Sequence, residues 1–306
     1  MHFAQMYHHF HDEIHPVGQG SISAEVFDDL INATKRQGKT FLEPNDYIEK
    51  ALNGTLKDTE TALTFDDSLR CQYDVAWPVM QAHDLRGFFF CYTNLHLPDV
   101  TKLEFYRDFR NVFFDDMEAF YASFFEAVKA DNEQAFDPAH AAIEKGFLGD
   151  CAFFTYNDKV YRYVRDYVLG PKKYDVIMDR MMAAANYPFA ERTELLLMSS
   201  AMIRDLSDQG NAIGLHSHTH PMVMTHLTKE KQAEEYGTNH EILQNITGQA
   251  PITMSHPCGH YDATTLAVLR ELGVTVGFRS TITQREIKSP LEIPREDHAN
   301  LVRNIL

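Results

Sequence analysis

Short apolar segments alternate with segments of helical period along much of this chain, and this alternation is the strongest constraint on its fold. Parallel strands joined by helices produce such a pattern, because each strand needs a crossover connection to return to the same edge. The expected strands cover residues 6–10, 61–65, 87–92, 211–215, 252–255, 274–278 and 291–293. The expected helices cover residues 23–37, 44–54, 73–83, 193–208, 229–246 and 262–272. We therefore expect an α/β protein with a parallel sheet, either open or closed into a barrel.

The ends of the expected helices carry residues that suit those positions. Ser23 and Asp262 each precede a helix and can accept a hydrogen bond from its first turn. Pro44 fits the start of its helix, where a missing N–H leaves no bond unmade. Gly38 and Gly248 follow helices, where the left-handed conformation favours glycine. These residues support the helix boundaries given above.

Residues 98–189 interrupt the alternation. They are rich in aromatic residues at helical spacing, and they offer no cluster of metal-ligating types at a recognisable spacing. We expect a helical insertion that separates the two parts of a discontinuous domain, residues 1–97 and 190–306. Its aromatic side chains are expected to form a core or a homo-oligomer contact in preference to a platform for stacking sugars. These residues include Phe105, Phe109, Phe113, Phe120, Phe124 and Phe125.

The charge of the chain limits the partners that it can bind. Its 306 residues include 28 Lys and Arg against 44 Asp and Glu, which gives a formal net charge of -16. Such a chain repels nucleic acids and anionic membrane surfaces. No apolar run reaches membrane-spanning length, and the N-terminal residues lack the basic and apolar regions of a signal peptide. We expect a cytoplasmic protein that binds no nucleic acid and does not insert into a membrane.

Polar side chains follow four of the expected strands. Asp66 and Asp67 come after residues 61–65, and histidines fill alternate positions of residues 216–220 after the strand at 211–215. Further polar residues follow at 255–260 and at 295–298. In parallel α/β barrels the site lies at the carboxyl ends of the strands. These segments, far apart in sequence, are therefore expected to converge.

The residue types at these strand ends suit a hydrolytic metal site. Two imidazoles and one carboxylate are a common ligand set for a catalytic zinc, and they leave positions open for water and substrate. The metal lowers the pKa of bound water towards neutrality. Adjacent aspartates point in different directions, so one can bind metal while the other acts as a base on that water. The spacing alone leaves the reaction open.

Two of these segments also resemble a known family. The sequences TFDD at residues 64–67 and HSHTH at residues 216–220 resemble the first two motifs of the polysaccharide deacetylase (NodB-type, carbohydrate esterase family 4) homology domain, TFDD and H-[ST]-x-x-H. HPCGHYD at residues 256–262 resembles its third motif, and YHH at residues 7–9 is similar to the first strand of many members. The resemblance covers residues 60–92 and 193–300. It implies a distorted (β/α) barrel of about seven strands and metal-dependent hydrolysis of N-acetyl or O-acetyl groups on sugars.

The resemblance also implies roles for individual residues. Carried over by position, it makes Asp66 the catalytic base and makes Asp67, His216 and His220 the ligands of one divalent metal ion. Zinc is the expected metal, with cobalt, nickel and manganese as alternatives. The expected substrate is an N-acetylated amino sugar, as a precursor of a surface polysaccharide or other glycan.

The turn at residues 256–262 and the last strand end supply the remaining expected site residues. The backbone N–H of Cys258 is expected to stabilise the oxyanion, with His256 beside it at the substrate. The family's third motif carries an Arg that holds the catalytic aspartate. Ser255 stands at that position, and Arg295 is expected to replace the Arg from the last strand end. The family's late Leu-x-His motif, which supplies the general acid, has no clear match, and His298 is our candidate for that role.

Two other functions fit parts of the sequence. An amidohydrolase-type barrel also uses His-x-His, but on its first strand, whereas here the histidines come late and follow Asp66 and Asp67. A catalytically inactive, glycan-binding protein would explain the missing Arg of the third motif, although the intact ligand set opposes that reading. His218 falls at a variable position of its motif, so we leave it out of the ligand set. His9 and His11 share one face of the first expected strand, and His9 is expected to line the cleft.

Overall fold

The computed structural model describes residues 3–18, 20–96, 99–148, 155–280 and 286–306. The chain divides into two compact units. One unit comprises Met1–Thr101 together with Ala190–Leu306, and the other comprises Lys102–Phe189. The predicted start of the insertion, at residues 97 and 98, lies outside the described residues.

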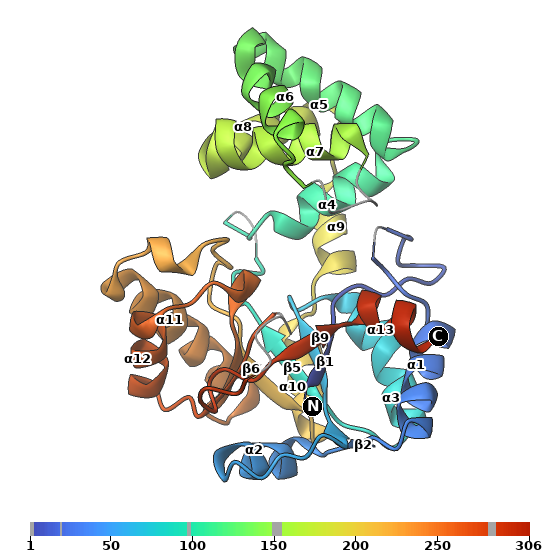
Figure 1. Cartoon of the computed structure of the whole chain (residues 1–306), viewed down its shortest axis with the longest axis vertical. Coiled ribbons are helices and arrows are strands. Elements are labelled where there is room, and N and C mark those ends of the chain that lie inside the picture. Colours follow the sequence, from blue (N-terminus) through green and yellow to red (C-terminus); the bar gives the residue numbers. More distant parts are fainter. Residues whose placement is uncertain (1–2, 19, 97–98, 149–154, 281–285) are drawn as a thin grey trace. The chain divides into compact units, whose positions relative to one another are not determined.

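A parallel sheet of seven strands forms the centre of the first unit (Figure 1). The strands are β1 (Ala4–Tyr7), β4 (Leu63–Asp66), β5 (Phe88–Cys91), β6 (Ala212–Leu215), β7 (Thr253–Ser255), β8 (Val276–Phe278) and β9 (Arg295–Asp297). They lie in the order β8-β7-β6-β5-β4-β1-β9, and every neighbouring pair is parallel. A separate pair, β2 (Thr40–Phe41) and β3 (Glu60–Thr61), is also parallel. The predicted α/β class is confirmed.

The segment that leads into β9 nearly closes the sheet into a barrel. Ile293 forms a parallel bridge with Phe278 of β8, and the N–H of Arg279 donates to the carbonyl of Ile293 at 2.8 Å. Two residues later, Arg295 pairs with Ala4 of β1. Residues 293–297 therefore contact β8 on one side and β1 on the other. This arrangement confirms the expected distorted (β/α) barrel.

Two of the predicted strands were placed wrongly. The first strand is Ala4–Tyr7 and not residues 6–10, because its ladder with β4 stops at the pair Tyr7–Phe65. His8 therefore lies just beyond the strand end. The last strand is Arg295–Asp297, after the predicted 291–293. The sequence of this strand is charged, because it lies where the barrel interior is polar, and so it lacks the apolar pattern used to predict strands.

Helices surround the sheet, and several begin at the predicted residues. Ser23 caps the first helix by accepting a hydrogen bond from the N–H of Val26, and Gly248 ends another with a φ of 77°. A π-helical turn, η1 (Gln72–Ala76), precedes α3. The α-helices of this unit are α1 (Ala24–Arg36), α2 (Pro44–Leu52), α3 (Trp77–Ala82), α10 (Ser200–Asp208), α11 (Lys229–Thr247), α12 (Ala263–Glu271) and α13 (His298–Ile305).

The helix predicted over residues 193–208 is two helices. The first, α9 (Phe189–Leu196), ends where Leu197 bridges Leu69, and the N–H of Met198 donates to the carbonyl of Ser68 at 2.8 Å. Ser199 then caps α10 by accepting a hydrogen bond from the N–H of Met202. The backbone between the two helices therefore hydrogen-bonds to the turn that follows Asp67.

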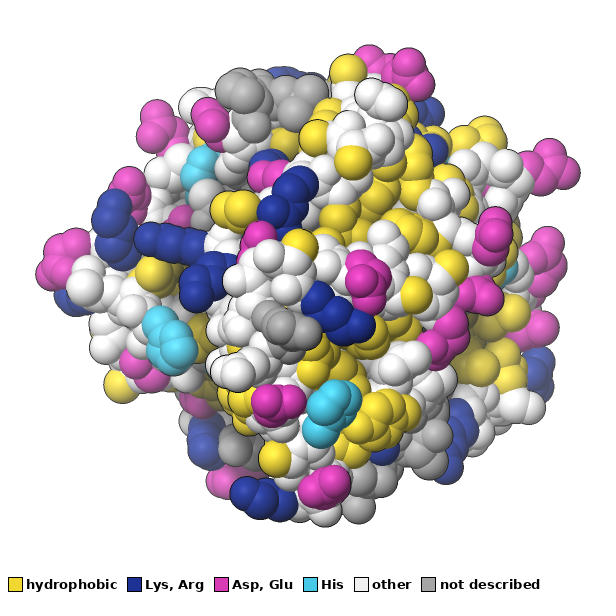
Figure 2. Space-filling view, turned by 90° about the horizontal axis from the view of Figure 1, so that it is seen from above, with side chains coloured by type: hydrophobic (Ala, Val, Ile, Leu, Met, Phe, Trp, Pro, Cys, Tyr) yellow, Lys and Arg dark blue, Asp and Glu magenta, His cyan; other side chains and the backbone are white. Residues whose placement is uncertain are grey.

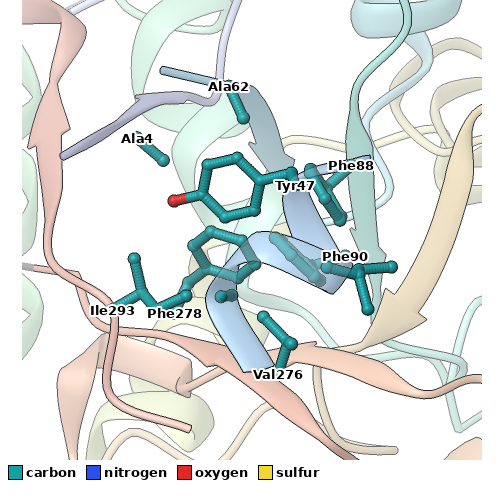
Figure 3. Packing of buried hydrophobic residues seen from close by; sticks show 10 residues of the cluster. Ala4, Tyr47, Ala62, Phe88, Phe90, Val276, Phe278 and Ile293 are labelled. Carbon is teal, nitrogen blue, oxygen red and sulfur yellow. The ribbon is translucent and has the colours of Figure 1, made fainter. Parts of the chain in front are cut away.

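One end of the barrel interior is closed by apolar side chains. Ala4, Phe88, Val276 and Ile293 project from the strands and pack around Tyr47 of α2, as Figure 3 shows. All five are buried. Helix α2 therefore acts as a plug at this end.

Farther along the barrel axis the interior becomes polar. Side chains alternate across a strand, so Phe90 continues the interior face of Phe88, and Arg295 continues that of Ile293. Phe90 packs on Phe278 with ring centroids 5.3 Å apart, and the Cζ of Arg295 lies 5.8 Å from the centroid of the Phe90 ring. The packed rings of Phe90 and Phe278 thus lie next to the buried guanidinium of Arg295.

The second unit is helical and has an aromatic core of its own. Phe105, Phe109, Phe120 and Phe124 are buried, whereas Phe113 is exposed. The predicted core role of these aromatic residues therefore agrees with most of them. The helices are α4 (Leu103–Val112), α5 (Met117–Asp131), α6 (Asp137–Glu144), α7 (Tyr156–Tyr163) and α8 (Gly170–Ala184), with a 3-10 turn at Glu133–Phe136 and a π-helical turn at Val164–Leu169.

The surface mixes charge types. On the face drawn in Figure 2, basic side chains are interspersed with acidic and hydrophobic ones. Within the described part of the chain, no helix is both long enough and apolar enough to cross a membrane.

Gly214 of β6 provides a test of the packing inside the barrel. A Cβ atom at this position would lie 2.6 Å from the Phe90 ring and 2.6 Å from Thr253 Oγ1. We expect Gly214→Ala to lower the free energy of unfolding by about 1–3 kcal/mol, measured by urea denaturation, because the aromatic layer must shift. Gly237 on α11 has open space around it, so Gly237→Ala should raise stability by up to about 1 kcal/mol. Equal effects of the two variants would contradict this packing.

Candidate active site

Two adjacent aspartates end β4 and diverge. Asp66 is the last residue of the strand, while Asp67 and Ser68 have φ values of 80° and 56°. The left-handed turn that begins at Asp67 points the two carboxylates in different directions. Both carboxylates are buried, so each needs partners that compensate for the loss of water.

Asp67 meets two histidines from the loop after β6. The distance from Asp67 Oδ1 to the Nε2 atoms of His216 and His220 is 3.3 Å in each case. All three residues are buried, and their ligand atoms lie within 4.8 Å of one another. Tetrahedral zinc with bonds of about 2.0–2.1 Å would separate its ligands by about 3.3–3.4 Å. The spacing therefore fits one metal ion.

The hydrogen bonds around this set leave the inward-facing atoms free for a ligand. His216 Nδ1 lies 2.9 Å from the carbonyl oxygen of Ser255. Because that oxygen can only accept, Nδ1 carries the hydrogen and Nε2 presents its lone pair. Asp67 Oδ1 is buried without a hydrogen-bond partner among the described residues. The donor chemistry fits a divalent cation.

Asp66 is held by Arg295 from β9. The guanidinium donates from Nη1 to Asp66 Oδ1 at 2.7 Å and from Nη2 to Asp66 Oδ2 at 2.6 Å. Ser255 Oγ donates to Asp66 Oδ2 at 3.0 Å and accepts from Arg295 Nη2 at 2.7 Å. Burial raises the pKa of Asp66, but the charge and hydrogen bonds of Arg295 and the nearby His216 outweigh it, so the pKa lies below its usual value. Arg295 thus contacts the aspartate in the way expected for it, with Ser255 bridging the pair.

His8 is a site residue that the sequence reasoning missed. Its Nε2 lies 3.9 Å from Asp67 Oδ2 and 4.0 Å from Asp66 Oδ2, and its side chain is 27% exposed. The amide of Gln72 donates to the carbonyls of His8, at 2.9 Å, and Asp66, at 2.6 Å, and so joins the two strand ends. The signal was present, because His8 follows the first strand directly, as the other site residues follow theirs. His9, which was expected to line the cleft, packs beside His8 with ring centroids 6.4 Å apart.

His298 does not join the Asp67 set. It begins α13, where it is buried, and its Nε2 lies 2.7 Å from the carbonyl oxygen of Gly20. Its ligand atom lies within 4.8 Å of those of His8 and Asp297. His298 therefore lies close to His8, and its Nε2 is already bonded to the backbone carbonyl of Gly20.

In the turn after β7, the two predicted site residues differ in burial: Cys258 lies at the surface and His256 lies in the core. Cys258 is exposed and has a φ of 51°. His256 is fully buried: its Nε2 lies 2.9 Å from the carbonyl oxygen of Leu291, and its ring stacks on Tyr261 at 4.1 Å. Burial lowers the pKa of His256 to about 4. His256 is a neutral core histidine that supports the turn, and it has no exposed surface to offer a substrate.

His218 also stays outside the ligand set. Its Nδ1 lies 2.9 Å from Thr93 Oγ1, and its backbone carbonyl accepts from the N–H groups of Thr93 and Asn94 at 3.2 and 2.9 Å. These contacts tie the histidine loop to the end of β5.

A family model described as polysaccharide deacetylase matches residues 150–277, which include the histidine loop and the turn after β7. This match supports a divergent polysaccharide deacetylase homology domain. The Asp66–Asp67 turn of this deacetylase domain lies outside the matched residues. No curated protein matches the chain in sequence.

Solved structures share the fold of the deacetylase domain. A de-N-acetylase from Aggregatibacter actinomycetemcomitans is 14% identical, with a TM-score of 0.58 over 99% of each chain. The Streptococcus pyogenes deacetylase PplD in complex with acetate is 15% identical, with a TM-score of 0.56 over 99% of this chain and 97% of that one. IcaB from Ammonifex degensii is 13% identical, with a TM-score of 0.56 over 96% and 89%. At these identities the likeness shows the fold.

We expect the buried ion pair of Arg295 and Asp66 to show strong coupling in the free energy of unfolding. Arg295→Met should lower the free energy of unfolding by about 3–5 kcal/mol, because it leaves the Asp66 carboxylate buried without its cation. Adding Asp66→Asn should recover about 1–3 kcal/mol of that loss, because the uncompensated charge is then gone. Urea denaturation of the single and double variants measures both values. If the two single losses simply add in the double variant, the pairing makes no such contribution.

Proposed function

We propose that this chain is a metal-dependent deacetylase that hydrolyses the acetyl group of an N-acetylated sugar. The observation that carries the proposal is the division of labour between two neighbouring carboxylates. Asp67 converges with His216 and His220 at 3.3 Å, while Asp66 is held separately by Arg295. This arrangement supports a metal ligand set beside an ionised base, and the match to the polysaccharide deacetylase family supports the reaction class.

The ligand set determines which cofactor suits the site. A divalent metal held by Asp67, His216 and His220 would lower the pKa of water and polarise the acetyl carbonyl. Two imidazoles and one carboxylate favour zinc, with cobalt, nickel and manganese as alternatives.

Asp66 would act as the general base. As a water oxygen attacks the acetyl carbonyl carbon, the Asp66 carboxylate accepts the proton that the water loses. Arg295 and Ser255 orient both carboxylate oxygens, at 2.6 to 3.0 Å, and keep Asp66 ionised until that step. The backbone N–H of Cys258 would stabilise the negative charge that develops on the carbonyl oxygen.

His8 would complete the reaction as the general acid. It takes the place of His298 in this proposal, because His8 adjoins both aspartates and its side chain remains partly exposed. Its proton passes to the sugar nitrogen as the C–N bond breaks, which yields acetate and the free amine.

The identity of the sugar is the finer part of the proposal. One of the structures with this fold is described as a de-N-acetylase, which favours an N-acetyl substrate. Another contains acetate, which hydrolysis of any acetyl group would release. We propose a small precursor of a surface polysaccharide or glycan. A cytoplasmic location and a homo-oligomer formed through residues 98–189 stay predictions.

Asp66→Asn tests the assignment of the base. The variant should keep the metal ligands but lose about 10²–10⁴-fold in the rate of acetate release, because no carboxylate remains to accept the proton. A screen of acetylated amino sugars for acetate release identifies the substrate, and elemental analysis checks that metal content is unchanged. Full activity in the variant would remove Asp66 from the mechanism.

His8→Gln and His298→Gln form a matched pair. With the substrate from that screen, His8→Gln should lower kcat by about 10²–10⁴-fold with metal content retained, because the leaving nitrogen then lacks its proton donor. His298→Gln can still donate to the carbonyl of Gly20 and should lose far less activity. The reverse order of effects would return the acid role to His298.

A further inference from the structure

The histidine loop after β6 is a strained segment. Ser217 and His220 have φ values of 63° and 53°, in the left-handed region that disfavours residues other than glycine. A strained loop persists only where surrounding contacts over-determine its shape. The loop carries both histidines of the proposed metal set, so whatever holds its shape also sets the directions of those ligands.

One face of α11 supplies much of this support. Glu235 Oε2 accepts from the N–H groups of His218 and Thr219, at 3.0 and 2.8 Å, and its Oε1 accepts from Thr219 Oγ1 at 2.7 Å. Asn239 lies one turn later and accepts from the N–H of His216 at 3.0 Å through Oδ1. Residues four apart share a helix face, so both side chains reach the same loop. Figure 1 shows α11 in the same part of the unit as β6.

Asn239 also connects the loop to the neighbouring strand. Its Nδ2 donates to the carbonyl of Cys91 at 2.9 Å and to Thr93 Oγ1 at 3.1 Å. Asn239 is fully buried, so its amide can fulfil these bonds only in one orientation. Together the two residues fix the backbone of His216 and of the residues just before His220.

We propose that Glu235 and Asn239 are positioning residues, which hold the loop in the shape that the metal requires before the metal binds. The inference rests on the proposed function, because it takes Asp67, His216 and His220 as the metal ligands. Neither residue is one of the proposed ligands, and each acts through its hydrogen bonds to the loop. Outer contacts that orient ligands commonly change metal affinity by about 10–100-fold when they are removed.

Glu235→Gln tests this role with the full chain. The Gln amide oxygen can still accept from the two N–H groups, and its NH2 can donate to the Thr219 hydroxyl, but the negative charge that strengthens all three bonds is lost. Zinc affinity, measured by competition with a chromophoric chelator, should fall about 10–100-fold. The absorption spectrum of the cobalt-loaded protein should also change, whereas the melting temperature of the metal-free protein should stay near that of the wild type.

Glu234→Gln is the matched control, because Glu234 is an exposed neighbour on the same helix that pairs with Lys231. It should leave zinc affinity unchanged. Thr219→Val removes one hydroxyl contact while keeping Glu235, and it should lower affinity by about 3–10-fold. This variant decides the question if Glu235→Gln fails to fold.

These measurements distinguish failure of the positioning role from failure of the proposed function. If Glu235→Gln keeps the wild-type zinc affinity and cobalt spectrum, the positioning role is wrong and the proposed function still stands. If Glu235→Gln does not fold, wild-type zinc affinity in Thr219→Val leads to the same conclusion. A wild-type chain that binds neither zinc nor cobalt would overturn the proposed function and this inference with it.

Discussion

The buried pair between Arg295 and Asp66 joins the segment that nearly closes the barrel to the strand that ends at Asp66 and leads into Asp67. Moving two charges out of water is costly, and only dense hydrogen bonding makes such a pair tolerable. Every nitrogen of the Arg295 guanidinium is engaged, with Thr64, Ser255, Asp66 and the carbonyl of Arg279 as acceptors. Thr64 and Asp66 lie on β4, Ser255 ends β7, and Arg279 follows β8, so the full set of bonds forms only when these segments of the barrel are assembled.

The same demand for satisfied polar groups shapes the rest of the site. Parallel strands leave free N–H and C=O groups where their ladders end, and side-chain amides take over there. Gln72 bonds the carbonyls that follow β1 and β4, and Asn239 links the ends of β5 and β6. The left-handed residues at Asp67, Ser217 and His220 are stabilised by this framework. A site held in this way is organised before any ligand arrives.

The sequence predicted the features that depend on local pattern. Alternation of strands and helices predicted the parallel sheet, the family resemblance implied its closure into a barrel, and polar residues after strands identified the segments that converge. The failures concern tertiary context. His8 was missed because the first strand was drawn too long, which hid its position at a strand end. The strand at Arg295–Asp297 was missed because buried charges violate the apolar pattern of a strand. His256 looked like a site residue, yet only the fold reveals that its ring faces the core.

The proposed chemistry depends on one physical property, which is the ability of Asp67, His216 and His220 to share a cation. The intact contact of Arg295 with Asp66 also removes the main reason for reading the chain as catalytically inactive, namely the missing Arg at the position of Ser255. Elemental analysis of purified protein tests the central claim most directly. The account predicts about one divalent metal ion per chain, as in other sites with this ligand set, and its loss in His216→Ala. A metal-free wild-type protein that also gains no thermal stability from added zinc or cobalt would contradict it.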